Sequence, residues 1–275
     1  MSLTQDAISI IMKKNFWEPY IEIEEQNILF AINRIQKPKI NPIAEKRVED
    51  IWAQKVNESK ERGRTLTSDP LFGVLSVEQE GNKCILNVYE SEYKYVVASR
   101  NFQIPGYCEY FLGVRGICFF ESNEVKYIIL GERKKEITYM GGDIEPIPAG
   151  LIEPEDLKDD PVRTALMREL REEIPPTDED DVVRITPITL KRNRQYVSFD
   201  IRCLVELNSR WLRKYKICQK TDCIEIQSAK NDFPEHERII GVSTTHLSTF
   251  ILANGGRLTH SKDAFLDIQQ VVNLS

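Results

Sequence analysis

The sequence lacks the features that mark a membrane protein or a disulfide-rich one. No apolar run in its 275 residues approaches the roughly 20 residues that cross a bilayer. The N-terminal stretch also lacks the charged, apolar and small-residue order of a signal peptide. The six cysteines show no CxxC spacing and the three histidines form no pattern, so the sequence gives no sign of a zinc site. We expect a cytoplasmic protein with reduced thiols and without a membrane partner.

Positive charge is also scarce. The chain has 37 Lys and Arg against 43 Asp and Glu, a net charge of −6. Nonspecific affinity for nucleic acid comes mainly from Lys and Arg that neutralise phosphates, so we expect no nucleic-acid partner. A small phosphorylated ligand needs only a local concentration of cations. The stretches 131–135 and 191–194 each contain such a cluster of Lys and Arg. An exposed turn is the commoner interpretation of any single cluster of this kind.

Acidic residues are abundant, and they concentrate at one place in the sequence. Glu169, Glu172 and Glu173 are spaced i, i+3 and i+4, so one turn of helix would point three carboxylates in nearly one direction. Without a counter-charge these groups repel one another, whereas a hard divalent cation such as Mg²⁺ would attract all three. A solvated acidic face is the commoner interpretation of such a pattern taken alone.

The ends of this acidic helix are marked in the sequence. Asp160 is a good N-cap, Pro161 suits the first helical position, and Pro175 stops the helix. Glu172 and Glu173 fall in the last turn, where the helix dipole disfavours negative charge. Helix stability therefore does not explain their position. The residues between the two ends form an apolar stripe at helical spacing: Val162, Ala165, Leu166, Leu170 and Ile174.

The segment that starts at Gly150 resembles the signature of the Nudix hydrolases, which is a glycine, an acid and then an Arg-Glu-apolar-x-Glu-Glu helix. Gly150 matches the glycine, Asp156 or Asp160 stands at the acidic position, and residues 168–173 match the helix. Residues 148–150, Pro-Ala-Gly, are similar to the start of the motif in the sugar-nucleotide and ADP-ribose branch of that family. The segment departs from the pattern in a longer stretch between Asp156 and the helix and in having Pro175 where a glycine is expected, which predicts a bulged loop and a different helix exit.

This resemblance implies an α/β fold, namely a Nudix-type α/β/α sandwich with a mixed sheet. We expect it over residues 110–275, preceded by a smaller α+β N-terminal domain over residues 1–109. The resemblance also implies Mg²⁺ or Mn²⁺ as cofactor, with four metal ligands, Gly150, Glu169, Glu172 and Glu173. The catalytic residues would be Arg168, Glu172 and Glu173. Of these, Arg168 would orient the carboxylates.

The implied reaction is hydrolysis of the pyrophosphate bond of a nucleoside diphosphate linked to another moiety. A nucleotide sugar of the UDP-sugar or ADP-ribose type is the expected substrate, and a homodimer is compatible with the family. Arg133 and Arg194 lie at strand ends that flank the motif, so we take both as substrate-binding residues. The general base stays open, although residues 234–237 form an acidic loop of the kind in which this family places a catalytic glutamate. The alternative is a catalytically inactive nucleotide-binding or regulatory protein on the same scaffold.

Hydrophobic periodicity predicts the remaining elements. A helix is expected from residue 43, ended by Gly63, and a second one over 246–256, ended by glycine. Cys118 and Cys203 lie in apolar strand patterns, where cysteine usually serves as a small core residue. Strands are expected at 20–23, 28–32, 72–79, 83–89, 93–100, 112–120, 125–130, 182–190 and 195–207.

Overall fold

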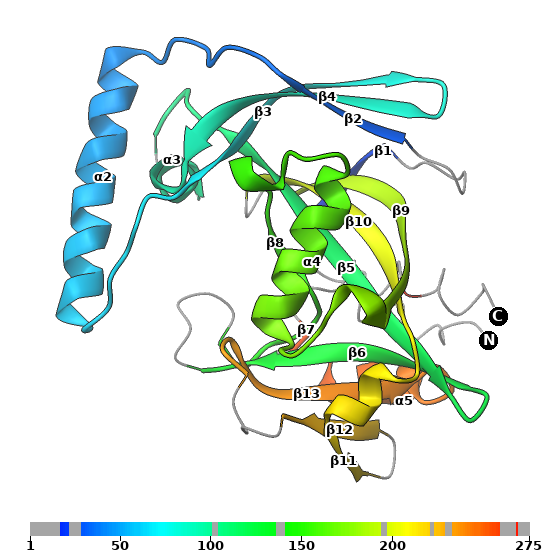
Figure 1. Ribbon diagram of the computed structural model, residues 1–275. Helices are drawn as coiled ribbons and strands as arrows, with labels where there is room; N and C mark the ends of the chain where they lie inside the picture. Colours follow the sequence, from blue (N-terminus) through cyan, green and yellow to red (C-terminus); the bar gives the residue numbers. More distant parts are fainter. Residues whose placement is uncertain are drawn as a thin grey trace.

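The computed structural model describes residues 17–21, 29–100, 104–135, 141–193, 197–220, 223–228, 233–258 and 268. These residues form a 13-stranded mixed sheet (Figure 1). β5 and β10 pair in parallel, and the other neighbours along the main path are antiparallel. The main path runs in the order β1 (Trp17–Ile21), β9 (Val182–Asn193), β10 (Ser198–Leu207), β5 (Tyr110–Ser122), β6 (Val125–Arg133), β13 (His236–Ser243), β12 (Cys223–Gln227) and β11 (Lys216–Gln219).

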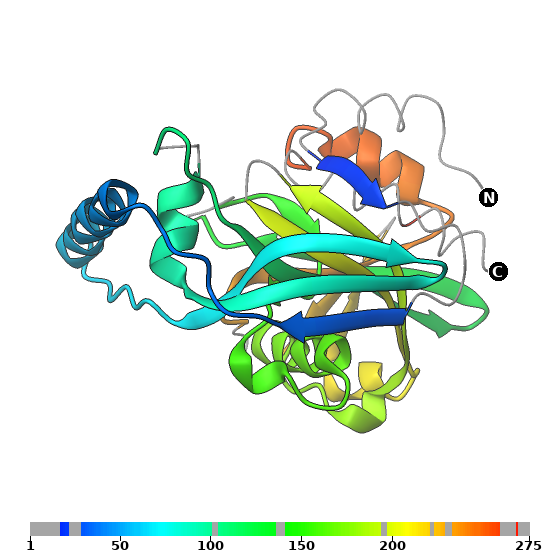
Figure 2. The ribbon, with the colours of Figure 1, turned by 90° about the horizontal axis from the view of Figure 1, so that it is seen from above.

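Helices cover both faces of this sheet. Along β5, Leu112, Val114, Cys118 and Phe120 belong to the core shared with α4 (Pro161–Glu173), whereas Ile117 and Phe119 belong to the core shared with α5 (Leu247–Asn254). Successive side chains of a strand point to opposite faces, so this alternation places the two helices on opposite sides. Figure 2 shows α4 and α5 on either side of the strands. The predicted α/β/α arrangement is confirmed.

The N-terminal segment extends the same sheet. β4 (Lys83–Glu92) pairs with both β2 (Leu29–Arg34) and β3 (Pro70–Glu80). β3 joins β5 through Gly73 opposite Phe111 and Val74 opposite Tyr110. Phe72 and Leu86 are buried in the core that also contains the apolar side of α4. The apolar core is therefore continuous across residues 109 and 110, and the division into two domains at that point stays a prediction.

One predicted strand is wrong. Residues 93–100 were expected to be extended, but Tyr93–Ser99 form a short helix, α3, that packs against α2 (Pro42–Glu61). Tyr95 to Ser99 are all buried, and a run buried on every side shows no periodicity that distinguishes helix from strand. Tyr95, Val96 and Ala98 share a small core with Ala44 and Val48 of α2, so tertiary packing decides the conformation.

The other predicted elements agree with the structure over the described residues, and residues 22–23, 28 and 195–196 of the predicted strands lie outside them. α2 starts after the N-cap Asn41, α5 ends at Gly255, and the β5–β6 hairpin turns at Asn123 and Glu124, both with positive φ. None of the six cysteines forms a disulfide in the described structure. None of the described helices is long and apolar enough to cross a membrane. The short elements are β7 (Ile144–Pro146), β8 (Ala149–Leu151) and the 3₁₀ turns Pro154–Asp156, Glu179–Asp181 and Trp211–Lys214.

Candidate active site

The helix α4 begins and ends where the sequence predicts. Asp160 precedes it, and its side-chain oxygen accepts a hydrogen bond from the backbone N–H of Arg163 at 3.0 Å. Glu173 is the last helical residue and Ile174 caps the helix before Pro175 and Pro176. Asp160 is therefore occupied as an N-cap, as predicted, and the extra residues before it form part of the loop between Asp156 and the helix.

The strand β8 crosses directly against the acidic edge of this helix. A Cβ atom on Gly150 would lie 1.8 Å from Oε1 of Glu169, so no side chain fits at that position beside the glutamate. One residue earlier, the backbone N–H of Ala149 donates a hydrogen bond of 3.2 Å to Oε1 of Glu173. Glycine at position 150 thus allows the backbone of β8 to approach the two carboxylates closely.

Arg168 ties the start of the motif to the helix. Its Nη1 donates to Oε1 of Glu169 at 2.6 Å, and its Nη2 donates to the Leu151 carbonyl at 2.8 Å and to Oδ2 of Asp156 at 2.9 Å. Asp156 is buried and also accepts from the backbone N–H of Glu153. Of the two aspartates that the sequence left open for the acidic position, Asp156 is thus the one that contacts the arginine.

Two of the three helical carboxylates are buried together. Burial outweighs the opposing charge of Arg168 and raises the pKa of Glu169 to about 8, with a smaller contribution from the nearby Glu172. Burial, together with the charges of Glu145, Glu169 and Glu235, raises the pKa of Glu173 well above its ordinary value. Oε2 of Glu173 is buried without a hydrogen-bond partner. A cation at this edge would supply the missing counter-charge.

These residues fit a hard divalent cation in their chemistry. Carboxylate and carbonyl oxygens are the ligands that Mg²⁺ and Mn²⁺ prefer, and the Glu173 oxygen and the backbone of Gly150 offer both kinds. The third predicted ligand is placed differently, because the side chain of Glu172 is 58% exposed and lies 3.7 Å from Nη1 of Arg168. Among the residues that the structure describes, no three His, Cys, Asp or Glu side chains converge closely enough to hold a metal ion.

Arg133 lies at the end of β6, next to this acidic edge. Its Nη1 donates to Oε1 of Glu145 at 2.7 Å, and its Nη2 donates to Oε2 of Glu235 at 3.2 Å. Burial opposes ionisation of Glu145, but the guanidinium groups of Arg133 and Arg115 outweigh it and lower the pKa of Glu145. Arg133 therefore connects a buried carboxylate in β7 with the half-exposed Glu235 in the loop before β13.

A cavity of about 240 Å³ lies beside Gly150 and Arg133. Three arginines and two carboxylates line it, together with apolar groups from β5, β8 and α3. The positive charge exceeds the negative by one, which suits an anionic ligand. Arg194, the other predicted substrate-binding residue, lies outside the described residues. The charged lining residues are Arg100, Arg115, Arg133, Glu145 and Asp200.

Several of these residues were missed by reasoning from the sequence. Arg115 and Asp200 interrupt apolar strands, and a charged residue within such a strand indicates a buried polar site. Glu145 stands shortly before the Pro-Ala-Gly motif, in the short strand β7, where the sequence predicts only a loop. The contribution of α3 was missed because residues 93–100 were assigned to a strand. The signal that could have revealed Arg115 and Asp200 is the presence of a charged residue within the predicted strands 112–120 and 195–207.

Comparisons with known proteins give structural similarity alone. No protein-family model matches the chain, and no curated protein matches it. One similar solved structure is a mutT/nudix family protein from Listeria innocua, with 16% identity and a TM-score of 0.37, over 60% of this chain and 98% of that one. Another is the NUDIX domain of Shewanella oneidensis NrtR complexed with ADP ribose, with 15% identity and a TM-score of 0.32, over 58% of this chain and 87% of that one.

A third similar structure is a C. elegans Ap4A hydrolase, with 16% identity and a TM-score of 0.32, over 57% of this chain and 98% of that one. The names MutT and Nudix recur among the similar structures. At such low identities and TM-scores, the activity and substrate of this chain have to be inferred from its own residues.

Proposed function

We propose that the chain is a Nudix-type hydrolase, dependent on Mg²⁺ or Mn²⁺, that cleaves the pyrophosphate bond of a nucleoside diphosphate linked to another group. A nucleotide sugar of the UDP-sugar or ADP-ribose type is the substrate we favour. One observation carries the proposal: two buried carboxyl groups with raised pKa values lie against β8, Glu169 at Gly150 and Glu173 at Ala149, and Gly150 also lines the arginine-lined cavity.

Each residue of the site has a part in this reaction. Glu169, Glu172, Glu173 and the Gly150 carbonyl would hold the cation, which when bound neutralises phosphoryl oxygens and makes a bound water more acidic. Arg168 fixes the orientation of Glu169 through the 2.6 Å hydrogen bond. Arg115 and Arg133 line the cavity, where their guanidinium groups suit bidentate contacts with the diphosphate oxygens.

Glu235 is the residue we propose as general base. Its carboxylate is 49% exposed, is held by Arg133, and lies near enough to Glu169 and Glu173 to raise the pKa of both. A water oxygen would attack one phosphorus atom while its proton passes to an oxygen of Glu235, and the bond from that phosphorus to the bridging oxygen breaks. Arginine contacts would stabilise the charge on the departing phosphate.

The alternative is a nucleotide-binding protein without catalysis. It is favoured by the outward position of Glu172 and by the lack, among the residues with described positions, of three converging metal-binding side chains. The arginine-lined cavity would then bind the same ligands without turnover.

A substrate screen separates the two candidates. Nucleotide sugars and dinucleotides are incubated with the protein and Mg²⁺ or Mn²⁺, and phosphate is measured after a coupled phosphatase. Cation-dependent phosphate release from nucleotide sugars supports the hydrolase. Binding of the same compounds in calorimetry without any release supports the alternative, and the absence of both contradicts the site itself.

A further inference from the structure

The cavity beside Gly150 is not built by the motif alone, because α3 forms part of its wall. Tyr93 and Val96 of this helix, and Arg100 directly after it, line the cavity together with Gly150 and Arg133. The helix belongs to the N-terminal segment, at a long distance in sequence from the acidic helix. The N-terminal segment therefore contributes side chains to the site proposed above.

Tyr93 is held in place by its surroundings. Its ring meets the ring of Trp52 edge-on, with 6.5 Å between the centroids, and the guanidinium carbon of Arg100 lies 5.9 Å from the centroid of the Tyr93 ring. The backbone N–H of Tyr93 donates to the carbonyl of Asp69 at 2.9 Å. Such contacts from different elements fix both the backbone and the ring, so the ring can act as a stable wall.

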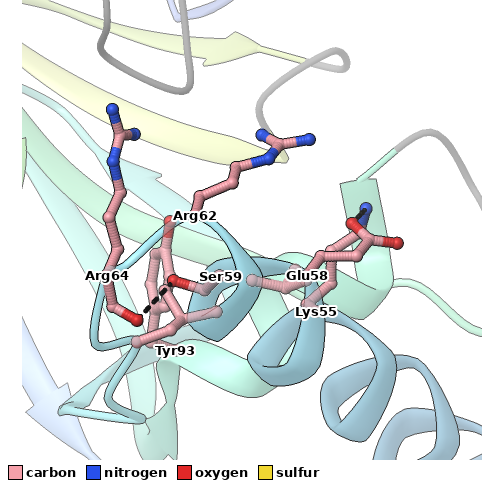
Figure 3. Close-up of a pocket in the computed structure, with 8 residues that line it drawn as sticks. Lys55, Glu58, Ser59, Arg62, Arg64 and Tyr93 are labelled. Atoms are coloured by element: carbon pink, nitrogen blue, oxygen red, sulfur yellow. Dashed lines mark hydrogen bonds and ion pairs between the residues drawn. The ribbon is translucent and has the colours of Figure 1, made fainter.

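A second cleft, of about 200 Å³, is also lined by Tyr93. Lys55, Arg62 and Arg64 give it positive charge, partly offset by Glu58, and Figure 3 shows the two arginines extending in one direction above Tyr93. Tyr93 is the only described residue that lines both spaces. The two spaces are therefore neighbours at Tyr93.

The volume of the first cavity limits what it can hold. Pockets for whole drug-sized ligands usually span about 300–1,000 Å³, so the 240 Å³ beside Gly150 suits one moiety of a nucleotide conjugate. A longer conjugate would need the neighbouring cleft as well. Tyr93 is the residue that the two linings share.

We propose that Tyr93 and Arg100 form a size-selecting wall, in which the Tyr93 ring limits the group attached to the diphosphate and Arg100 holds the ring. This inference rests on the proposed function for the identity of the ligand. It assigns the N-terminal segment a role in substrate choice: the wild-type protein prefers a conjugate that ends in a sugar over one that carries a further ring on that sugar.

ADP-ribose and NAD⁺ form a suitable pair of probes, since NAD⁺ carries a nicotinamide ring where ADP-ribose ends in its terminal ribose. Calorimetry without divalent cations measures the Kd of both, which avoids any dependence on turnover. We expect wild-type protein to bind ADP-ribose more tightly. Tyr93→Ala should join the two spaces and shift the ratio of the two Kd values towards NAD⁺ by roughly tenfold, since each tenfold corresponds to about 1.4 kcal/mol.

Tyr93→Phe is the matched control, because it keeps the ring and should leave the ratio unchanged. Tyr93→Leu and Arg100→Gln provide tests that remove less packing if Tyr93→Ala does not fold, and both should shift the ratio in the same direction. A wild-type protein that binds both probes, with variants that weaken both by the same factor, overturns the wall while leaving the proposed function in place. Failure of the wild-type protein to bind either probe contradicts the ligand assignment and the wall with it.

Discussion

Arg133 is the residue that connects the acidic edge with the cavity. It contacts a buried carboxylate, Glu145, and a half-exposed one, Glu235, while its remaining surface lines the space beside Gly150. A guanidinium held on two sides is already oriented before any ligand arrives, which lowers the entropic cost of binding an anion. This position agrees with the expectation that Arg133 flanks the motif at a strand end.

Arg133→Ala should raise KM more than it lowers kcat, because a contact made equally in the ground and transition states changes binding alone. Steady-state kinetics on the best substrate of the screen would measure the split. Arg184→Ala is the matched control, since that side chain lies near the start of β9, is 64% exposed and pairs with Glu206. An unchanged KM in Arg133→Ala would remove this residue from the substrate site.

Asp156 and Asp160 should respond differently to substitution. Asp160 caps α4, so Asp160→Ala should cost about 1 kcal/mol of stability and leave Mn²⁺ affinity nearly unchanged. Asp156 holds Arg168 and through it Glu169, so Asp156→Asn should weaken Mn²⁺ binding. Thermal unfolding and calorimetric titration of Mn²⁺ measure the two effects. Loss of metal binding in Asp160→Ala alone would mean that the capping aspartate, and not Asp156, serves the metal site.

At the scale of elements, the contact between α4 and β8 buries two carboxyl groups, and burial disfavours their ionised form. Glu169 and Glu173 have pKa values raised by burial, so the folded chain holds protons that the unfolded chain has released. The stability contributed by these protonated groups is fully present below the ordinary value of 4.5 and is lost as pH rises through about 8. A bound cation would reverse this loss, because it favours the ionised carboxylates.

The stability of the metal-free protein should therefore fall between pH 5 and pH 8, and Mg²⁺ or Mn²⁺ should restore part of it at pH 8. Thermal unfolding with EDTA and with cation at each pH measures both effects. Glu169→Gln removes one titrating group and should flatten the profile. A wild-type profile that is equally flat, or a cation that stabilises more at pH 5 than at pH 8, would contradict this description of the α4–β8 contact.

The elements also show how far the sequence determines this fold. Capping residues and an apolar stripe define α4 in the sequence, because local chemistry and helical spacing agree there. They do not define α3, where buried aromatic and β-branched residues fit a strand equally well and packing on α2 decides. The motif likewise predicts Glu169 and Glu173 beside Gly150. The partners Glu145, Arg115 and Asp200 come from strands whose register is set only by the whole sheet.

At the scale of the whole molecule, the N-terminal strands and the acidic helix share one apolar core. Leu86 of β4 is fully buried in it, together with Leu166 and Leu170 of α4. Folding of residues 29–100 and folding of the remaining chain should therefore be coupled. The division predicted between residues 109 and 110 would then mark two parts of the structure that unfold together.

Leu86→Ala should lower stability by about 2–5 kcal/mol and leave a single unfolding transition, because the cavity it creates lies in the shared core. Urea unfolding followed by tryptophan fluorescence and circular dichroism tests both points. Leu75→Ala is the control, since Leu75 is 56% exposed and its loss should cost little. Two separate transitions, with only one of them shifted by Leu86→Ala, would show independent domains instead.

The most direct test of the central proposal is turnover by Glu173→Gln beside wild-type protein. The substitution keeps the size and the hydrogen bond from Ala149 while it removes the buried carboxyl group that would ionise to hold a cation. With a nucleotide sugar at saturating Mg²⁺, we predict that wild-type protein releases two phosphorylated products and that Glu173→Gln loses at least about a hundredfold in kcat, roughly 2.7 kcal/mol, with its fold intact by circular dichroism. Hydrolysis at the wild-type rate by Glu173→Gln would show that this helix is not the metal site.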